Sequence, residues 1–589
     1  MVFNAFLLYL YRFLLFFIFH HYFRKNSFKL CVHSIIFVVL LSKSLKISTY
    51  ISQNLNNMKK ITFIFLATLI SLISYSQDFN GFALYNAQGE NTTYLIDENQ
   101  NIAHTWTMST ECNYTVQLKD NGNLVRGTKN NVQTGGTNNQ LNGAADAGRV
   151  QEIDPNGNVV MDFFYSSPTF LSHHDLTLIG DNILITAWEV KSSTEVNDAG
   201  GSATSDKWPT HFVEIANDGN GGGQIVWEWH IWDHMVQDTD TSKPNYGVIA
   251  DNPQLIDINM INGGGGGGQG GGGGDWFHVN GVDYNEDLDQ IAFSSRFASE
   301  IYIIDHSTTT AEAASHSGGN SAMGGDILYR WGNPNNYGVS GAQVIPNAVH
   351  DVRWITNDGR PNGGFLQVFN NSGVSNNQSA VDGIETPIDP NNQYNYFRAN
   401  GQAFGPSSYT TRYACQYSAS GQSASDRMSN GNIFVNASGG QGGAGVMYEV
   451  DDNEIIVWGP YNADAAKAFR YECDHPGIIA LEPYMNSTLT TSCFNVSNLQ
   501  QLNSLYNFDI YPNPSNGLFN LHLNVKEVSD LTISVTNSSG KTIYIKDVID
   551  CSGPIDKIID LKNHPVGLYS LMILSNNSLP LVKRIAHIK

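Results

Sequence analysis

The sequence has few basic residues for its length. Lys and Arg number 32 against 54 Asp and Glu among 589 residues, which gives a formal net charge of -22. Residues 1–77 contain eight of the basic residues and no acidic one, so the remaining 24 basic and 54 acidic residues carry a formal net charge of -30. An anionic surface of this kind repels polyanions, and we therefore expect no nucleic-acid partner.

The sequence also has few cysteines, six in all, and none of them lies in a CxxC motif. A thiolate metal site and thioredoxin-like chemistry therefore have no support. Five cysteines follow residue 76, namely Cys112, Cys415, Cys473, Cys493 and Cys551. This odd count leaves at least one of them unpaired within a monomer, and spacing alone does not decide which ones pair.

The composition excludes a disordered or fibrous protein, because 41% of the residues are hydrophobic and glycine and proline number 56 and 19. The length allows three or four domains, or one large repeat architecture with an accessory domain. The tract 263–274 is all glycine except Gln269, so it cannot pack a core and is predicted to be a flexible surface loop. A phosphate-binding role has little support, because no GxGxxG motif or Walker lysine stands between a strand and a helix there.

The first 76 residues are excluded from the fold prediction. Residues 1–57 contain apolar runs without the alternation or capping of a folded domain, and we interpret them as mistranslated upstream sequence in preference to a membrane anchor. Met58 then starts a segment with two lysines, an apolar run and small residues at its end, which predicts a Sec signal peptide over 58–76. The mature, exported chain would begin near residue 78.

Two short patterns repeat from residue 78 onward. In the first, a strand ends in an acidic residue, and a Gly- or Asn-containing turn leads to a β-branched run often closed by Trp. In the second, a polar strand start is followed by a turn and an apolar strand. The first pattern occurs at 93–106, 149–165, 211–230 and 446–459, and the second at 116–127, 173–189, 278–296, 350–370 and 427–439. Both are typical of antiparallel hairpins.

Pairs of these patterns give five or six units, and we choose six. The sequence therefore predicts an all-β chain with a six-bladed β-propeller over 78–493, followed by a linker at 494–508 and a small β-sandwich at 509–589. Insertions that enlarge some blades are expected at roughly 191–208, 232–275 and 306–325.

The C-terminal region carries three short motifs, which are YPNP at 511–514, SSGK at 538–541 and PVGLYSL at 565–571. With these motifs the region resembles the type A sorting domain that directs Bacteroidetes proteins through the type IX secretion system. The resemblance implies contact with the secretion machinery, passage across the outer membrane, removal of the domain, and release or surface attachment.

Three histidines share one position in the repeats. His174, His278 and His350 each open the second pattern, and Arg296 ends the hairpin that His278 begins. In a propeller the innermost strand of each blade points its first residues into the central channel. We therefore expect these four side chains to gather at one end of that channel.

Three imidazoles and a guanidinium suit a tetrahedral oxyanion better than a metal ion. A guanidinium offers forked donors to sulfate or phosphate oxygens and would repel a bound cation. Its fixed charge would also lower the pKa of a nearby histidine and keep that ring neutral as a nucleophile. Each histidine taken alone would be interpreted as a hydrogen-bonded structural residue, and it is their shared repeat position that favours a site.

Several motifs then occur in a characteristic order, namely HHDL with AWE (173–189), DWFHVNGVDY (275–284), SSRFASEIYIIDHS (294–307), ILYRWGNP (327–334) and HDVRW (350–354). They resemble the bacterial arylsulfate sulfotransferases of the PAPS-independent type. The resemblance implies a six-bladed propeller that moves a sulfuryl group from a phenolic sulfate ester to a phenol through a sulfohistidine, without a cofactor or a metal.

The resemblance also implies roles for particular residues. His350 would be the nucleophile, whereas His174, His278 and Arg296 would bind and stabilise the transferring group with Asn280 beside them. Neutral His350 would attack sulfur and a phenol would reverse the step, which gives ping-pong kinetics. Either His278 or His174 would carry the phenolic proton, and the sequence does not decide which.

The other aromatic and ionisable residues in these motifs are expected to be structural. We expect packing roles for Trp188, Trp227, Trp229, Trp232 and the WGNP turn at 331–334, and a structural or solvent-facing place for His173 and His306. His230 and His234 lie near Asp233, but no third ligand is spaced to complete a metal site.

Two departures from the family pattern are visible. The glycine tract lies just before Trp276 and His278, where it would line the channel mouth and alter acceptor choice. The chain also shows no N-terminal β-domain of the size that some members carry, which puts a dimer built on that domain in question.

Two other functions remain open from the sequence. A non-catalytic propeller displayed at the surface would retain a carbohydrate or protein ligand without turnover. A metal-dependent lyase or hydrolase would use the same histidines and lose activity on chelation.

Overall fold

The computed structural model describes residues 81–587 apart from short gaps, which are 130–140, 142, 144, 261–273, 341–342, 490, 495–505, 538–540 and 576–577. These residues belong to one of the chain's two compact units, Gln77–Lys589. The predicted upstream segment (1–57) and signal peptide (58–76), nearly all of the glycine tract and most of the predicted linker lie outside the described residues. None of the described helices is long and apolar enough to cross a bilayer.

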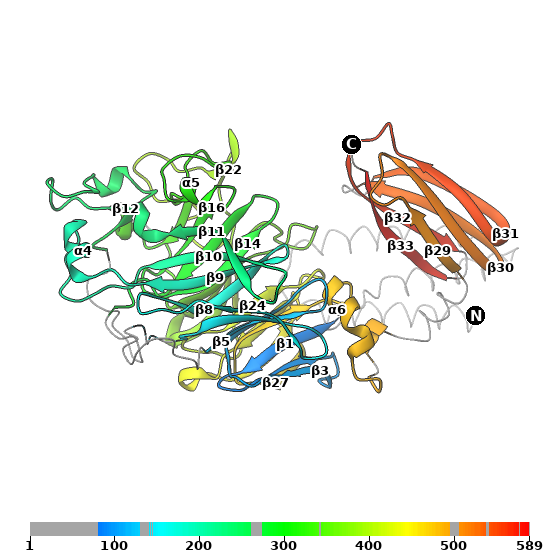
Figure 1. Ribbon diagram of the computed structural model, residues 1–589, viewed down its shortest axis with the longest axis horizontal. Helices are drawn as coiled ribbons and strands as arrows, with labels where there is room; N and C mark the ends of the chain where they lie inside the picture. The colour runs from blue at the N-terminus through cyan, green and yellow to red at the C-terminus, as the bar shows by residue number, and fades with distance from the viewer. Residues whose placement is uncertain are drawn as a thin grey trace, which may run out of the picture. The chain divides into compact units, whose positions relative to one another are not determined.

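The all-β prediction is confirmed (Figure 1). Among the described residues, the region before the linker forms six antiparallel sheets of four strands each. The first three sheets consist of β28 (Ala465–Tyr471), β1 (Phe82–Ala87), β2 (Thr92–Ile96), β3 (Ile102–Thr107); β4 (Cys112–Leu118), β5 (Leu124–Lys129), β6 (Gly148–Ile153), β7 (Val159–Phe164); and β8 (Phe170–Ile179), β9 (Asn182–Glu189), β10 (Thr210–Asn217), β11 (Gly223–His230).

The other three sheets consist of β14 (Val279–Asn285), β15 (Gln290–Ser295), β16 (Glu300–Asp305), β17 (Tyr329–Gly332); β18 (Val349–Trp354), β19 (Leu366–Val374), β20 (Gln378–Ile384), β23 (Thr411–Ala414); and β24 (Ala424–Arg427), β25 (Ile433–Ala437), β26 (Val446–Val450), β27 (Ile456–Asn462). Two short pairs, β12 (Met235–Val236) with β13 (Ile256–Asp257) and β21 (Ile388–Asp389) with β22 (Asn392–Tyr396), lie in connections, as do α4 (Ser193–Asp198) and α5 (Thr310–Ala313).

The first strands of the six sheets form a closed cycle of neighbours. Strand β28 packs beside β4, which is followed by β8, β14, β18 and β24, and β24 packs beside β28 again. The cycle closes because β28, near the end of this region, pairs with β1 at its beginning, so blue and yellow strands meet in Figure 1. This arrangement brings the starts of strands that are far apart in the sequence to one central region.

The acidic residue that ends a strand in the first pattern caps the following turn. Asp154 accepts hydrogen bonds at Oδ1 from the backbone N–H of Asn156 and of Asn158, at 2.9 and 2.8 Å. The same i+2 and i+4 bonds occur at Asp97, Asp218 and Asp451. A side-chain oxygen that satisfies the turn's donors explains why an aspartate recurs there.

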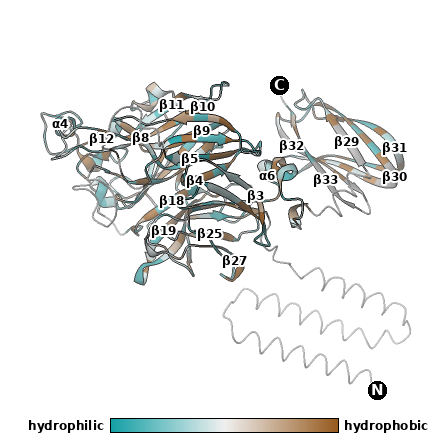
Figure 2. Ribbon diagram, turned by 60° about the horizontal axis from the view of Figure 1, so that its bottom comes forward, coloured by the Kyte–Doolittle hydropathy of each residue, from teal (hydrophilic) through white to brown (hydrophobic). Residues whose placement is uncertain are grey.

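The tryptophans that close the first pattern join one sheet to the next. Trp106 donates Nε1–H to the Asp154 carbonyl, and Trp458 donates to that of Glu98. Trp227 and Trp229 are buried in one hydrophobic cluster, which Trp232 packs against. The packing role expected for these residues is therefore observed. Figure 2 shows hydrophobic residues along the strands of these sheets, and β9 (NILITAWE) is buried along nearly its whole length.

The C-terminal region forms one sheet of five strands, which are β29 (Tyr506–Tyr511), β30 (Leu518–Asn537), β31 (Thr542–Asp560), β32 (Gly567–Ser575) and β33 (Ser578–His587). Register shifts after Val525 and Ser529 divide β30 into two segments, of which the first pairs with β29 and the second with β32. Both segments supply buried side chains to a single core, including Phe519 and Ile533.

One disulfide joins Cys473 to Cys493, on either side of α6 (Pro476–Leu481). Spacing alone did not show which cysteines pair, and this disulfide answers that question. Cys112 and Cys415 are buried thiols, which agrees with the odd number of cysteines after residue 76. Burial raises the pKa of the Cys112 thiol to about 11, which keeps it protonated and unreactive at neutral pH.

His306 links two neighbouring sheets as a buried cation. Its Nδ1 lies 2.6 Å from Asp289 Oδ1 and its Nε2 lies 3.1 Å from Glu214 Oε2. Although burial alone would lower the pKa of His306, the bonds to the two carboxylates raise it to about 9. The structural role expected for His306 is observed, and the side chain does not face solvent.

This ion pair predicts an alkaline loss of stability. Because the pKa of His306 is higher in the folded chain than the ordinary 6.5, its contribution is complete below pH 6.5 and is lost as the pH rises through about 9. We expect the free energy of unfolding to fall by on the order of 2 kcal/mol over that range. Urea denaturation of His306→Gln should show a lower stability at pH 6 and a flatter alkaline profile. An unchanged profile would contradict the assignment.

Candidate functional site

A backbone irregularity lies next to the site histidine of each of three inner strands. The pairing register shifts between Ser172 and Leu176 in β8, after Val279 in β14, and after His350 in β18. His174 and His278 adopt φ of 50° and 49°, in the left-handed region that L-residues rarely occupy. Bulges of this kind re-aim a side chain, and strained residues that persist are typical of functional sites.

His174 and His278 meet although they come from different sheets. Their ring centroids lie 4.5 Å apart at 77°, and both side chains are buried. Burial, together with neighbouring His278, His173, His350 and Lys467, holds the pKa of His174 well below 6.5, so its ring is neutral at pH 7. The predicted convergence of these two rings is observed.

His278 has a carboxylate partner that fixes its orientation. Its Nδ1 lies 2.5 Å from Asp275 Oδ2, and its ring stacks on Phe297 with centroids 4.7 Å apart. Asp275 also accepts hydrogen bonds from the His278 backbone N–H and from Trp188 Nε1. Nδ1–H therefore donates to Asp275, and Nε2 is the nitrogen available to a ligand.

The orientation of the His350 ring is set by two oxygens. Its Nδ1 lies 2.8 Å from the Ala348 carbonyl and 2.7 Å from Asn371 Oδ1. Asn371 donates its own Nδ2–H groups to the carbonyls of Ala419 and Gln422, which fixes its oxygen toward His350. Two acceptors at Nδ1 require the proton on that atom, so Nε2 keeps the lone pair that a nucleophile needs.

His350 is also held neutral by its surroundings. Burial is the largest cause, and the charge of Arg296 is the next, of a pKa well below 6.5. Arg296 follows β15, where its backbone N–H donates to the His278 carbonyl at 3.2 Å. Its guanidinium is partly buried, and across the described ranges no carboxylate pairs with it. A guanidinium without a counterion beside a neutral imidazole is suited to receive an anion.

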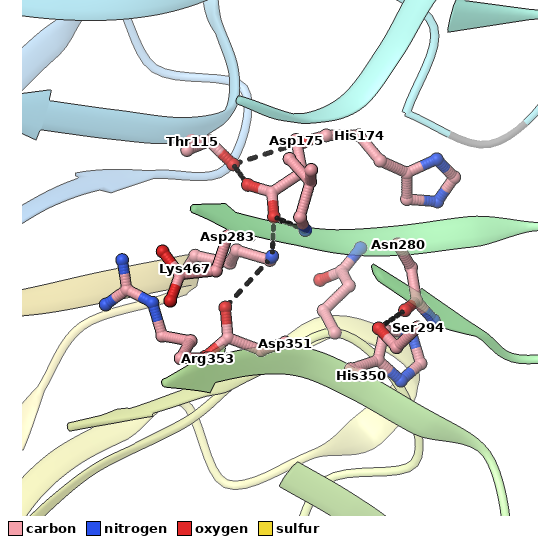
Figure 3. Close-up of polar contacts among 12 residues, drawn as sticks. Thr115, His174, Asp175, Asn280, Asp283, Ser294, His350, Asp351, Arg353 and Lys467 are labelled. Carbon is pink, nitrogen blue, oxygen red and sulfur yellow. Dashed lines mark hydrogen bonds and ion pairs between the residues drawn. The ribbon is translucent and has the colours of Figure 1, made fainter. Parts of the chain in front are cut away.

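Asn280 ties two inner strands together. Its Nδ2 donates to the Val349 carbonyl at 2.8 Å, and its Oδ1 accepts a hydrogen bond from Ser294 Oγ at 2.7 Å (Figure 3). The side chain is 1% exposed. Asn280 therefore fixes β14 against β18 next to His350, and its contact with a substrate stays a prediction.

A buried lysine, which the sequence did not indicate, joins the two His-Asp motifs. Lys467 Nζ lies 2.7 Å from Asp175 Oδ2 and 3.0 Å from Asp351 Oδ1, and Figure 3 shows it between them. Each aspartate directly follows a site histidine, His174 or His350. Lys467 lies on β28, the strand that closes the cycle. Its ammonium group therefore links β28 to the strands that carry His174 and His350.

Other expectations from the motifs have mixed outcomes. His173 is buried, contacts His174 Nδ1 at 2.8 Å and stacks on Trp188, so it is structural and not solvent-facing. Burial lowers its pKa to about 3. Trp188 is completely buried, as expected, and Trp331 of the WGNP turn packs inside with Nε1–H donated to the Pro406 carbonyl.

The expectation for the second histidine pair is corrected. His230 Nδ1 lies 3.1 Å from Glu189 Oε1, and His230 belongs to no group of potential metal ligands among the described residues. His234 instead meets His316 and Asp326, although the sequence offered no third ligand. His316 and Asp326 were missed because His316 lies in a different insertion and Asp326, just after it, is 92 residues from His234.

Two family models match the chain. The model described as arylsulfotransferase (ASST) matches residues 50–457, and that of the secretion system C-terminal sorting domain matches residues 509–588. No curated protein sequence matches.

Several solved structures are similar at low identity. A periplasmic gluconolactonase from Pseudomonas aeruginosa is 10% identical, with 81% of this chain and 98% of that chain covered and a TM-score of 0.30. A putative 6-phosphogluconolactonase from Bacteroides uniformis is 8% identical, with 82% and 100% covered and a TM-score of 0.32. A functionally unknown protein from Desulfotomaculum acetoxidans is 11% identical, with 67% and 99% covered and a TM-score of 0.32.

Proposed function

The chain belongs to the arylsulfotransferase (ASST) family, and we propose that it transfers a sulfuryl group from a phenolic sulfate ester to a phenol through a sulfohistidine on His350. The C-terminal sorting domain directs the protein to export, to the cell surface or the exterior. The observation that carries the proposal is the His350 ring, whose proton is fixed on Nδ1 and whose pKa is lowered by the charge of Arg296, a guanidinium that pairs with no carboxylate in the described part of the chain.

The same proposal includes the architecture. We infer that the six four-stranded sheets are the blades of a six-bladed propeller and that the bent C-terminal sheet folds as a small sandwich. The closed cycle of first strands supports the first inference, because a propeller packs the inner strands of successive blades side by side in such a cycle.

In the first half-reaction, Nε2 of His350 donates its lone pair to sulfur, and the bond between sulfur and the phenolic oxygen breaks. The leaving oxygen takes the bonding electrons and a proton from a general acid. The ring becomes an N-sulfoimidazolium, whose positive charge Ala348 O and Asn371 Oδ1 stabilise at Nδ1–H. Arg296 and the polar groups around it stabilise the sulfuryl oxygens.

In the second half-reaction, the acceptor phenol attacks sulfur and the bond from sulfur to Nε2 breaks. The electron pair returns to Nε2, and the phenolic proton moves to the group that acted as acid. We assign that group to His278, because Asp275 is positioned to stabilise its imidazolium. His174 is held neutral and suits a binding role better. No cofactor takes part in either step.

Replacing Arg296 tests the anion site. Arg296→Gln removes the charge that stabilises the sulfuryl oxygens in the transition state, and we expect kcat to fall about 100-fold. The pKa of His350 should also rise, because Arg296 helps to lower it. Steady-state kinetics with p-nitrophenyl sulfate and phenol over a range of pH would measure both effects. Arg398→Gln is the control and should keep full activity, because that guanidinium donates to the nearby Gln402 carbonyl and lies over the Phe404 ring.

The function itself is tested by incubating the protein with p-nitrophenyl sulfate and a panel of phenols. We expect p-nitrophenol release that depends on the acceptor, parallel lines in double-reciprocal plots, and the same rate with EDTA at a temperature well below unfolding. Retention of ligands without turnover would favour the binding propeller. A rate abolished by EDTA would favour a metal-dependent enzyme.

A further inference from the structure

We propose that His234, His316 and Asp326 form a structural binding site for a divalent transition-metal ion of the zinc class, separate from the histidines of the transfer site. His234 ends a short 3-10 helix, η2 (Ile231–His234), whereas His316 follows α5 and Asp326 precedes β17. The site therefore joins the two insertions that the sequence places at 232–275 and 306–325.

The three potential ligand atoms converge on one point. Asp326 Oδ1 lies 2.8 Å from His234 Nδ1 and 2.7 Å from His316 Nδ1. All three atoms lie within 4.8 Å of one another. Zinc bound to nitrogen and oxygen at about 2 Å needs ligand atoms a few tenths of an ångström further apart than a hydrogen bond. A small shift of the Asp326 carboxylate away from His234 and a rotation of exposed His316 would supply that spacing.

The position of the proton on His234 favours a metal ligand. Its Nε2 lies 2.8 Å from the Ala313 carbonyl and must therefore carry a hydrogen. In the neutral ring, the lone pair of Nδ1 then faces the lone pairs of the Asp326 carboxylate, and the two repel each other. A cation bound between them would accept both lone pairs and remove that repulsion. A histidine whose second nitrogen donates to a backbone carbonyl is the usual arrangement around bound zinc.

The surroundings of His234 form a rigid cradle. A Cβ added to Gly325 would lie 2.7 Å from His234 Nε2 and 1.9 Å from the Ala313 carbonyl oxygen, so only glycine fits there. Trp229 stacks parallel to the His234 ring at 5.6 Å and donates Nε1–H to the Gly325 carbonyl at 2.7 Å. The ring is thus held in place before any ion binds.

The donor set and its exposure define the ligand class. Two imidazole nitrogens and one carboxylate oxygen suit Zn²⁺ and related transition metals, whereas Ca²⁺ and Mg²⁺ prefer oxygen ligands throughout. The His234 side chain is fully buried, but that of His316 is 61% exposed. Water completes the fourth position from that open side. Because the ion would close a loop across residues far apart in the chain, its role is to stabilise the fold.

The test is a titration of the chelator-treated protein with Zn²⁺ alone, followed by calorimetry and thermal unfolding. We expect one equivalent to bind and to raise the unfolding midpoint. His316→Ala should fold normally, because that side chain is exposed, yet bind at least ten times more weakly and show no rise in the midpoint. His522→Ala removes an exposed histidine that pairs with Asp556 alone, and it should behave like the unmodified protein.

Cobalt substitution gives a second readout. Co²⁺ bound by these ligands should produce visible absorption bands in the unmodified protein and in His522→Ala, but not in His316→Ala. Equal zinc affinity in the unmodified protein and His316→Ala, or no uptake by either, would overturn the proposal. In the latter case the three side chains form a hydrogen-bonded cluster without a metal.

Discussion

Replacing His350 with alanine should abolish sulfuryl transfer, with a loss on the order of 10⁴-fold or more in kcat. The reason is the loss of the only atom proposed to bond to sulfur, since Nε2 carries the lone pair while Nδ1–H is bound to Ala348 and Asn371. Arg296 and His278 would remain to bind the donor, so donor affinity should change far less than kcat.

Two further variants separate the role of His350 as nucleophile from the role of the residue that orients its ring. Asn371→Ala keeps Nε2 but removes one of the acceptors that fix the proton on Nδ1, and we expect about a 10-fold loss, as for one lost hydrogen bond. His522→Ala alters a histidine of the sorting domain and should leave transfer unchanged. Circular dichroism confirms that each variant is folded. Substantial transfer by folded His350→Ala would rule out the sulfohistidine.

Replacing Lys467 with methionine should lower the free energy of unfolding by about 3 to 5 kcal/mol. The substitution leaves Asp175 and Asp351 without their shared cation in a region where their side chains and that of Lys467 are at most 3% exposed. Burial already raises the pKa of Asp351, and the charge of Lys467 opposes that rise, so Asp351 would take up a proton more readily without the ammonium group. The destabilisation should therefore be smaller at pH 5 than at pH 8.

Lys467→Met should also lower kcat, since the aspartates that it releases directly follow His174 and His350. Lys119→Met is the matched control, because Lys119 is equally buried and pairs with Glu152 at 3.0 Å on another part of the fold. We expect a comparable loss of stability but normal kcat in that variant. If both variants lost kcat equally at a temperature where they are folded, Lys467 would have no positioning role.

The general fold could be predicted because its signals are local. The aspartate of each turn accepts hydrogen bonds from residues two and four positions later, so the pattern is visible within a few letters. His174, His278 and His350 could be predicted as a group for a related reason. Each lies next to the register shift of an inner strand, at the same position in the repeat, and neighbouring inner strands pack side by side.

The supporting residues could not be predicted, because their partners are set by tertiary packing. Lys467 lies 292 residues from Asp175, and nothing in the sequence of its strand, AAKAFRY, indicates that partner. In the sequence, nothing distinguishes Asn371 from the many asparagines that serve turns. Only the structure shows that its side-chain oxygen faces His350. Asp275 is the one supporting residue whose partner could have been predicted, since it precedes His278 by three residues within one motif.

The central claim is that His350 carries the sulfuryl group between donor and acceptor, and trapping it is the most direct measurement. The protein is mixed with a phenolic sulfate ester in the absence of acceptor, quenched at alkaline pH and analysed as peptides by mass spectrometry. We predict one added SO₃ group per chain, located on His350 and lost when phenol is added before the quench. Release of the donor phenol with no adduct on His350, or with an adduct on another residue, would contradict the mechanism.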